Sequence, residues 1–427
     1  MTETSPVLGI LCGGGPAPGL NGVISAAALY ANKLGWKVYG FHDGYYHLAK
    51  GTIEDIKKNM IELTEDVVLP IAETGGSLVR PDRFDPSKSP QAVARVLSMF
   101  KELNIKYLII IGGNDKISST HLVTQGIDPA EMQVIVVPKT IDNDIQLPVG
   151  QTTFGFHSAR KFCTELVKNM IVDARSAPRW FLVETMGRHT GHLALSVAEA
   201  SGSHLCIIPE DFENKSVTLK DICDIFEGAI IKRAAAGKPY GVGIISQGLI
   251  NLLPKEEQVK LFDHGYVTMT SDGQINLDDA ELSRYIRNEM NTRLKAYGLD
   301  IRVNPKKIGY ELRCCKPVSF DAVYSQELGY GAIEGFKQKH SNCIVVWENG
   351  KVFYRSFRSL MNPEDGKIYP RKVDVTSQNY KISREYLWHV RDIDIQNEQS
   401  VAKMAKIIKH TPEEFVARFS QIAESSK

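Results

Sequence analysis

The stretch VVPKTIDND, residues 136–144, joins an apolar segment to a lysine, a hydroxyl and two carboxylates within a few positions. Its apolar start predicts a buried strand, and ligands of open α/β proteins bind beyond the carboxyl ends of such strands. One carboxylate could accept a proton, the other could hold a divalent cation, and the lysine could neutralise phosphate oxygens. Phosphoryl transfer requires groups of these kinds. The polar residues of the stretch that we expect at a ligand site are Lys139, Thr140, Asp142 and Asp144.

Short apolar runs alternate with longer amphipathic segments, which predicts parallel sheets with helices on both faces. The apolar runs are continuous rather than alternating, as is typical of strands buried on both faces. We expect strands at residues 7–11, 37–41, 107–111, 134–137, 180–184, 204–208 and 240–246. We expect helices at residues 22–33, 90–103, 158–173, 191–200, 219–236 and 281–297, with a further helix after Ser400.

Length and composition limit the classes of protein to consider. A chain of 427 residues exceeds the size at which one core stops growing, so two domains are expected, with a boundary near Gly150. A formal net charge of +1 argues against nucleic acid as a partner. Seven cysteines without short metal-ligand spacing indicate reduced thiols. No secretory signal or membrane-spanning run is visible, so we expect a cytoplasmic protein without a membrane partner.

Two glycine-rich loops follow predicted strands, CGGGPAPGLN at residues 12–21 and IGGNDK at residues 111–116. Glycines permit close backbone approach, and a following helix N-terminus favours an anion such as phosphate. A tight strand-to-helix turn is the alternative for the first loop considered alone. The first loop has neither the G-x-G-x-x-G nor the Walker A spacing, which disfavours a nicotinamide-binding dehydrogenase. Together with the acidic loop, the two glycine loops predict a phosphate site.

These motifs resemble the phosphofructokinase family. GGGPAPGLN is similar to its first phosphate loop, GGND to its second, and PKTIDND to its catalytic loop. The segments TFGFHSAR, ETMGRHTGH, GYELRC and FDAVYSQELGYGAIE follow in the expected order. The resemblance extends from about residue 7 to about residue 395 and is closest to the pyrophosphate-dependent branch.

The resemblance implies two Rossmann-like α/β domains with mainly parallel sheets and an active site in the cleft between them. Residues 1–150, together with about 310–427, would bind the phosphate donor, and residues 151–309 would bind the sugar phosphate. The implied reaction transfers a phosphoryl group from pyrophosphate to the 1-hydroxyl of fructose 6-phosphate. It would use Mg²⁺, form a reversible step of glycolysis, and take place in a homodimer or homotetramer.

Roles for single residues also follow from the resemblance. Asp142 matches the general base, and Arg179 matches an arginine that reaches the active site of a neighbouring subunit. The other residues expected to act in catalysis are Lys139, Asp115 and Arg188. The expected donor-phosphate residues are Gly14, Arg83 and Lys116, and the expected metal residues are Asn114 and Asp144. The expected substrate residues are Thr140, Asp142, Arg179, Met186, Gly187, Arg188, Gln247, Tyr310 and Arg313.

Donor choice depends on Asp115 and Lys139, which stand where ATP-using members typically have glycine. A carboxylate at position 115 would repel an α-phosphate, and the lysine supplies charge where a nucleoside would otherwise anchor the donor. Asn114 and Gln247, however, replace two carboxylates of the family, and Lys116 replaces a hydroxyl. Losing one strong electrostatic contact costs on the order of 3 kcal/mol of transition-state stabilisation. A catalytically weak or regulatory subunit and an ATP-dependent phosphofructokinase therefore stay open as alternatives.

Overall fold

The computed structural model describes residues 5–212, 215–270 and 273–423. The chain forms two compact units, each built from two separate stretches of sequence. The first unit comprises the described residues of Met1–Ala159 and Tyr310–Arg371, and the second those of Arg160–Gly309 and Lys372–Lys427.

The first unit is built on a seven-stranded sheet with the strand order β13-β12-β5-β4-β1-β2-β3. The central strands pair in parallel, whereas β13 and β3 are antiparallel edge strands. All residues of β1 and β5 are buried, which explains their continuous apolar sequences. The strands are β1 (Val7–Cys12), β2 (Lys37–Phe41), β3 (Met60–Glu62), β4 (Ile105–Gly112), β5 (Gln133–Pro138), β12 (Cys343–Glu348) and β13 (Lys351–Ser356).

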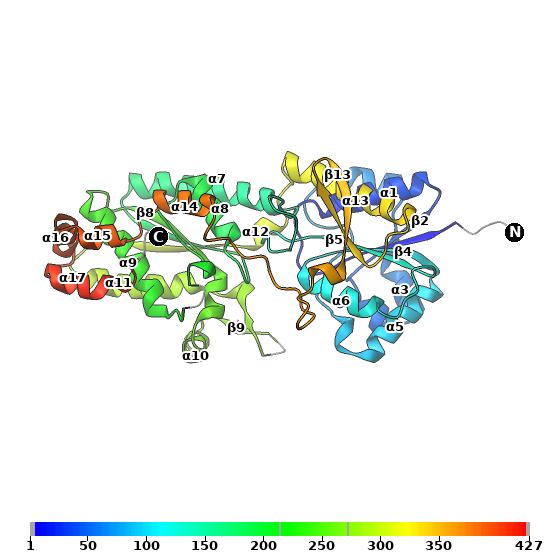
Figure 1. Ribbon diagram of the computed structural model, residues 1–427, viewed down its shortest axis with the longest axis horizontal. Coiled ribbons are helices and arrows are strands. Elements are labelled where there is room, and N and C mark those ends of the chain that lie inside the picture. The colour runs from blue at the N-terminus through cyan, green and yellow to red at the C-terminus, as the bar shows by residue number, and fades with distance from the viewer. Residues whose placement is uncertain (1–4, 213–214, 271–272, 424–427) are drawn as a thin grey trace. The chain divides into compact units, whose positions relative to one another are not determined.

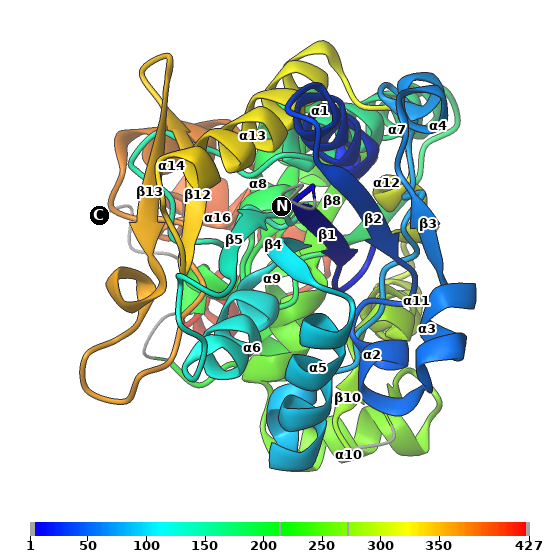
Figure 2. The same cartoon turned by 90° about the vertical axis from the view of Figure 1, so that its right-hand side faces the viewer.

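Helices cover both faces of this sheet, as Figure 2 shows. Helices α1 (Leu20–Lys33) and α13 (Ser319–Lys337) pack against each other on one face. The opposite face carries α5 (Pro90–Glu102) and α6 (Asn114–Thr124), and α2 (Tyr46–Lys50) packs beside α5. The shorter helices of this unit are α3 (Ile53–Lys58), α4 (Glu65–Val68) and α12 (Tyr310–Arg313).

The second unit has a four-stranded parallel sheet with the order β11-β6-β8-β7. Figure 1 shows α7 and α8 along one face of this sheet and α9 and α11 along the other. The strands are β6 (Trp180–Thr185), β7 (Leu205–Ile207), β8 (Gly241–Ser246) and β11 (Val303–Ile308), with a separate hairpin of β9 (Thr268–Met269) and β10 (Ile275–Asn276). The helices are α7 (Phe156–Ser176), α8 (His192–Ser201), α9 (Leu219–Ala235), α10 (Lys255–Asp263) and α11 (Leu282–Ala296). The predicted α/β class with mainly parallel sheets is confirmed.

The C-terminal segment corrects the expected domain boundaries. Residues 372–427 were expected with the first domain, but the described part of this segment packs on the second unit, and the first boundary follows Ala159 rather than Gly150. The reason is apolar burial, because Ile231 of α9 shares a core with Val401 and Phe415. The helices of this segment are α14 (Gln378–Tyr386), α15 (Asp392–Gln396), α16 (Glu398–Ile407) and α17 (Pro412–Phe419).

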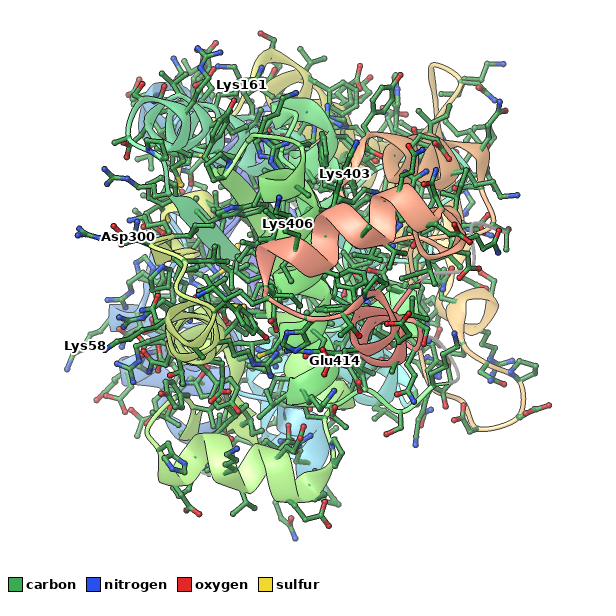
Figure 3. All side chains as sticks on the ribbon, turned by 90° about the vertical axis from the view of Figure 1, so that its left-hand side faces the viewer. Lys58, Lys161, Asp300, Lys403, Lys406 and Glu414 are labelled. Carbon is green, nitrogen blue, oxygen red and sulfur yellow. The ribbon has the colours of Figure 1, made fainter. Side chains whose placement is uncertain are left out.

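Charged side chains also hold this segment in place. Arg418 of α17 donates to the fully buried Glu227 of α9 at 2.6 Å, and Lys232 of α9 pairs with Asp394 at 2.6 Å. Lys403 and Lys406, labelled on α16 in Figure 3, are exposed, whereas the apolar residues of α16 face the unit. Within the described parts of the chain, none of the helices combines the length and the apolar character that a membrane crossing needs.

Candidate active site

Three loops of the first unit meet because their strands end side by side. Cys12 of β1 lies opposite Ile111 of β4, and Ile111 lies opposite Val137 of β5. Backbone hydrogen bonds continue this alignment into the loops, since Gly13 donates to Ile111 and Lys139 donates to Gly112, each at 2.9 Å. The two glycine loops and the acidic loop are therefore adjacent at the carboxyl edge of one parallel sheet, where ligands of open α/β folds bind.

The first glycine loop is shaped by Gly14, whose φ of +79° lies in the region that glycine adopts without strain. Its N–H donates to the carbonyl of Asp82 at 3.0 Å, so the segment that carries Arg83 lies along this loop. A Cβ atom on Gly15 would lie 3.1 Å from Cζ of Arg313, so that guanidinium also lies against the loop. The structure thus brings Gly14, Arg83 and Arg313 of the predicted site to one place.

Lys139 points into the same loop. Its Nζ donates to the carbonyl of Gly15 at 2.6 Å, and the residue is only 6% exposed. Burial lowers the pKa of Lys139 to about 8, and the nearby Arg313 acts in the same direction. An incoming phosphate would offset both effects, so the position fits a residue that neutralises donor oxygens.

The second glycine loop leads into α6, which begins at Asn114. The amide nitrogen of Asn114 donates to the carbonyl of Asp144 at 3.0 Å. Its amide oxygen is buried and has no hydrogen-bond partner within the parts of the chain that the structure describes. Such an oxygen is available to a cation or a donor group. Asp115 lies in the first turn of α6 and is exposed.

The side chain of Lys116 packs against Gly13 and Gly112 of the two glycine loops. A Cβ atom on Gly13 would lie 2.4 Å from its Cε, and its Nζ donates to the carbonyl of Phe84 at 2.5 Å. The ammonium also lies 5.6 Å from the centroid of the Tyr45 ring, and burial lowers the pKa of this lysine. Lys116 therefore braces the segment next to Arg83, and its expected contact with donor phosphate stays a prediction.

The acidic loop holds two carboxylates in unequal surroundings. Asp144 is 9% exposed, and burial, followed by repulsion from Asp142, raises its pKa to about 7. Asp142 is half-buried, and its backbone N–H donates to the hydroxyl of Thr140 at 3.0 Å. A buried carboxylate beside a second acid is stabilised by a cation, whereas the more accessible acid can take a proton.

The residues present fit a Mg²⁺ site that has few protein ligands and is completed by substrate and water. No group of three or more histidine, cysteine, aspartate or glutamate side chains is arranged to hold a metal ion in the described ranges. Mg²⁺ in phosphoryl-transfer enzymes usually relies on one or two carboxylates, with substrate phosphates and water completing the octahedron. Asp144 supplies a carboxylate, and the buried amide oxygen of Asn114 lacks a partner in the described structure.

In the second unit, the segment Met186–Arg188 follows β6 and is held by neutral donors. The hydroxyl of Ser246 lies 3.1 Å from the carbonyl of Gly187, and the amide of Asn251 donates to the carbonyl of Arg188 at 2.8 Å. Gly187 has a φ of +134°, which only glycine adopts readily. The backbone at Met186, Gly187 and Arg188 is therefore fixed before any ligand arrives.

Gln247 directly follows β8, which pairs with β6 so that Ser246 lies opposite Thr185, the residue before Met186. It is 2% exposed, and its Oε1 has no hydrogen-bond partner among the described residues. A buried amide oxygen without a partner is costly unless a ligand or water supplies a donor. Gln247 thus keeps an available acceptor oxygen, although it lacks the charge of the glutamate that the family resemblance implies.

Arg179 lies apart from the segment Met186–Arg188 in its own chain. It directly precedes β6, a six-residue strand that separates it from Met186. Such a strand spans roughly 20 Å. Tyr310 and Arg313 belong to the first unit, where the Arg313 guanidinium lies 5.1 Å from the Tyr310 ring centroid. Within one chain, the predicted substrate residues are therefore distributed over both units.

Sequence reasoning missed the residues that hold the Met186–Arg188 segment. Besides Ser246 and Asn251, Glu210 accepts the N–H of Gly191 at 2.9 Å, just beyond that segment. Ser246 had a detectable signal, because it is a hydroxyl at the end of an apolar strand, as Thr140 is. Asn251 and Glu210 had none, since each contacts a residue far from it in sequence.

Comparison with known proteins identifies relatives along nearly the whole chain. The phosphofructokinase family model matches residues 7–336. A pyrophosphate–fructose 6-phosphate 1-phosphotransferase of Thermotoga maritima is 37% identical, over 98% of this chain and 99% of the relative. A protein of the same name from Naegleria fowleri is 35% identical, over 98% of this chain and 96% of the relative.

Solved structures share the fold at lower sequence identity. The pyrophosphate-dependent phosphofructokinase of Marinobacter aquaeolei superposes with a TM-score of 0.65 at 16% identity, covering 95% of this chain and 92% of that one. The match to the family model and the full-length relatives agree with the glycine loops and the acidic loop described above. This chain belongs to the phosphofructokinase family.

Proposed function

We propose that this chain transfers a phosphoryl group from pyrophosphate to the 1-hydroxyl of fructose 6-phosphate. The products are fructose 1,6-bisphosphate and phosphate, and the reaction is reversible and belongs to glycolysis. The observation that carries the proposal is the position of Lys139, whose buried ammonium lies against the first glycine loop. The names of the full-length relatives support the same donor and acceptor.

In this proposal the sugar oxygen attacks the nearer phosphorus of pyrophosphate, and the bridging oxygen leaves with the second phosphate. Asp142 takes the hydroxyl proton, since it is the more accessible of the two acids in its loop. Lys139 and Arg83 balance the charge that spreads over the phosphoryl oxygens, since Lys139 donates to the glycine loop and the segment that carries Arg83 lies along it. Asp144 and Asn114 would hold Mg²⁺, which would supply positive charge against the donor phosphates.

Asp115 supports pyrophosphate over ATP as the donor. Its carboxylate is exposed in the first turn of α6, and its charge contributes to the raised pKa of Asp144. A third negative group beside Asp142 and Asp144 disfavours a longer polyphosphate chain. An ATP-dependent phosphofructokinase of Corynebacterium efficiens is 30% identical over 81% of this chain, so ATP belongs in the test.

The acceptor is proposed to be bound by residues of both units. Met186, Gly187, Arg188 and Gln247 would hold the sugar phosphate from the second unit, and Thr140, Tyr310 and Arg313 from the first. The position of Arg179, at the opposite end of β6 from Met186, supports a role in a second subunit and hence a homodimer or homotetramer. The cleft between the domains and the cytoplasmic location stay predictions.

The deciding experiment measures initial rates of fructose 6-phosphate phosphorylation with Mg²⁺ and either pyrophosphate or ATP. Asp142→Ala serves as the blank, and omission of Mg²⁺ tests the metal. Turnover with pyrophosphate that the variant abolishes would support the proposal. Turnover with ATP alone would overturn the donor assignment. Binding of fructose 6-phosphate without turnover by either donor would identify the regulatory subunit that Asn114 and Gln247 keep open.

A further inference from the structure

Arg371 makes more contacts to the acidic loop than any role described so far explains. It lies at the end of the first unit, beyond the residues that the family model matches. Its Nη2 donates to the carbonyl of Asn143 at 3.0 Å and to Oδ1 of Asn143 at 2.5 Å. Its Nη1 donates to the carbonyl of Gln151 at 2.9 Å, and its own backbone N–H donates to the carbonyl of Asp144 at 2.8 Å.

These bonds converge on a residue with an unusual backbone. Asn143 has a φ of +57°, in the left-handed region that costs most residues about 1 kcal/mol or more. Asparagine tolerates this region better than most, but it must still be held there by its surroundings. The guanidinium contacts both the main chain and the side chain of Asn143, so it holds this conformation from two directions.

Asn143 stands between Asp142 and Asp144 in the sequence. Its backbone conformation therefore determines the directions of these two carboxylates. Thr153 provides a second brace, since it donates its N–H to Oδ1 of Asn143 at 3.1 Å and its hydroxyl to the carbonyl of Thr140 at 2.6 Å. The planar fork of an arginine bonds several oxygens in a fixed geometry, which the compact ammonium of a lysine does not reproduce.

We propose that Arg371 is a positioning residue of phosphoryl transfer, which fixes Asp142 and Asp144 by clamping the left-handed backbone at Asn143. It contacts neither substrate nor metal in this assignment, and it acts through the loop alone. Misplacement of a catalytic group by about 1 Å can cost on the order of a hundredfold in rate. The inference rests on the proposed function for its kinetic consequence, but its structural part stands apart from it.

The test compares full-length wild type with Arg371→Ala and Arg371→Lys. We expect kcat of Arg371→Ala with pyrophosphate to fall about a hundredfold, while the KM values for pyrophosphate and fructose 6-phosphate change less than about threefold. Arg371→Lys should recover little, because it restores charge without the fork. Millimolar guanidinium should raise kcat of Arg371→Ala at least about tenfold, whereas an equal concentration of sodium chloride should not.

Hydrogen exchange supplies a readout that needs no activity. Amides of residues 139–153 should exchange faster in Arg371→Ala, while those of the buried strand β1 keep their wild-type rates. Arg358→Ala is the matched control, since Arg358 lies in the same unit and is exposed to solvent. It should leave both kcat and exchange unchanged.

The outcomes separate the two proposals. Unchanged exchange at 139–153 in Arg371→Ala overturns the clamp, and so does an unchanged kcat in an active enzyme. A large rise in KM without faster exchange also overturns it, because that result indicates direct substrate contact. If the wild type shows no turnover with pyrophosphate, the proposed function fails. Faster exchange in Arg371→Ala would then still support the clamp as a property of the loop.

Discussion

The acidic loop of the first unit and the Met186–Arg188 segment of the second are held in different ways. Around the acidic loop, burial lowers the pKa of Lys139 to about 8 and raises the pKa of Asp144 to about 7. Around Met186–Arg188, the hydroxyl of Ser246 and the amide of Asn251 lie at backbone carbonyls. The first arrangement lacks counter-charges that a ligand would supply, whereas in the second the backbone carbonyls of Gly187 and Arg188 are bonded before any ligand arrives.

This difference indicates that the acidic loop serves the chemical step and that the Met186–Arg188 segment serves substrate binding. Burial disfavours the charged forms of Lys139 and Asp144, and these forms gain stabilisation when a metal and a polyanion bind. We therefore expect these residues to act on the transferred group. A preformed backbone gains nothing in the transition state alone and so contributes uniform binding. Substitutions in the acidic loop should therefore lower kcat, and those at Met186–Arg188 should raise KM.

The largest effect is expected for Asp142→Asn. The amide cannot accept the hydroxyl proton, and loss of a general base costs about 10³-fold in kcat. The KM for fructose 6-phosphate should change little, since the substitution preserves shape. Steady-state rates with pyrophosphate check this. Asn104→Asp, an exposed change between the same residue types, is the control and should retain full activity. A kcat within tenfold of wild type would remove Asp142 from its role.

Lys139→Met should have the next largest effect. The methionine fills the buried space but leaves the glycine loop without its ammonium, which donates to the carbonyl of Gly15. Loss of one such charge costs about 3 kcal/mol, so kcat/KM for pyrophosphate should fall about a hundredfold. Lys33→Met, at the end of α1, is the control. A change confined to a rise in the KM for fructose 6-phosphate would instead assign Lys139 to the acceptor.

The same lysine predicts a pH dependence of the wild-type enzyme. Burial lowers the pKa of Lys139 to about 8, so its positive charge is present below that pH and is lost above it. Since kcat/KM reports the free enzyme, kcat/KM for pyrophosphate should fall by about tenfold near pH 9. Lys139→Met should lack this alkaline limb. An unchanged limb in the variant would show that another group titrates.

Ser246→Ala tests the other side of the comparison. Without its hydroxyl, the carbonyl of Gly187 loses a donor, and the segment that follows β6 becomes less ordered. Losing a buried hydrogen bond costs about 1–2 kcal/mol, so the KM for fructose 6-phosphate should rise about tenfold with little change in kcat. The control is Ser201→Ala, at the end of α8, which removes a hydroxyl that donates within its own helix, to the carbonyl of Ala198. A fall in kcat for Ser246→Ala would contradict the proposed division.

Much of the first unit could be predicted because its signals are local. Continuous apolar runs predicted β1 and β5, and the polar residues directly after them predicted the loops. Strand β11 was missed, since Val303–Ile308 contains a proline and two lysines. Such residues are tolerated at the edge of a sheet, where β11 lies.

The supports of the site could not be predicted for a different reason. Arg371 stands more than two hundred positions from Asn143, and nothing in its neighbours distinguishes it from a solvated arginine. The packing of Lys116 could not be predicted either, because its stem lies against glycines at positions 13 and 112, which leave room for it. Spacing along the chain reveals which residues share an element, whereas these contacts depend on tertiary packing.

The smallest effect is expected for Asn114→Asp, which tests whether more negative charge beside Asp144 helps or hinders metal binding. Asn114 donates its amide N–H to the carbonyl of Asp144, and its amide oxygen has no partner among the described residues. Asn114→Asp would turn it into a carboxylate, a better ligand for a hard cation. We expect the Mg²⁺ concentration that gives half-maximal rate to fall about threefold to tenfold, with kcat at saturating Mg²⁺ within about threefold of wild type. Titration of initial rates with Mg²⁺ measures both. If Asn114→Asp requires more Mg²⁺, repulsion among the acids outweighs ligation, and Asn114 then serves to limit negative charge beside Asp144 rather than to hold the metal.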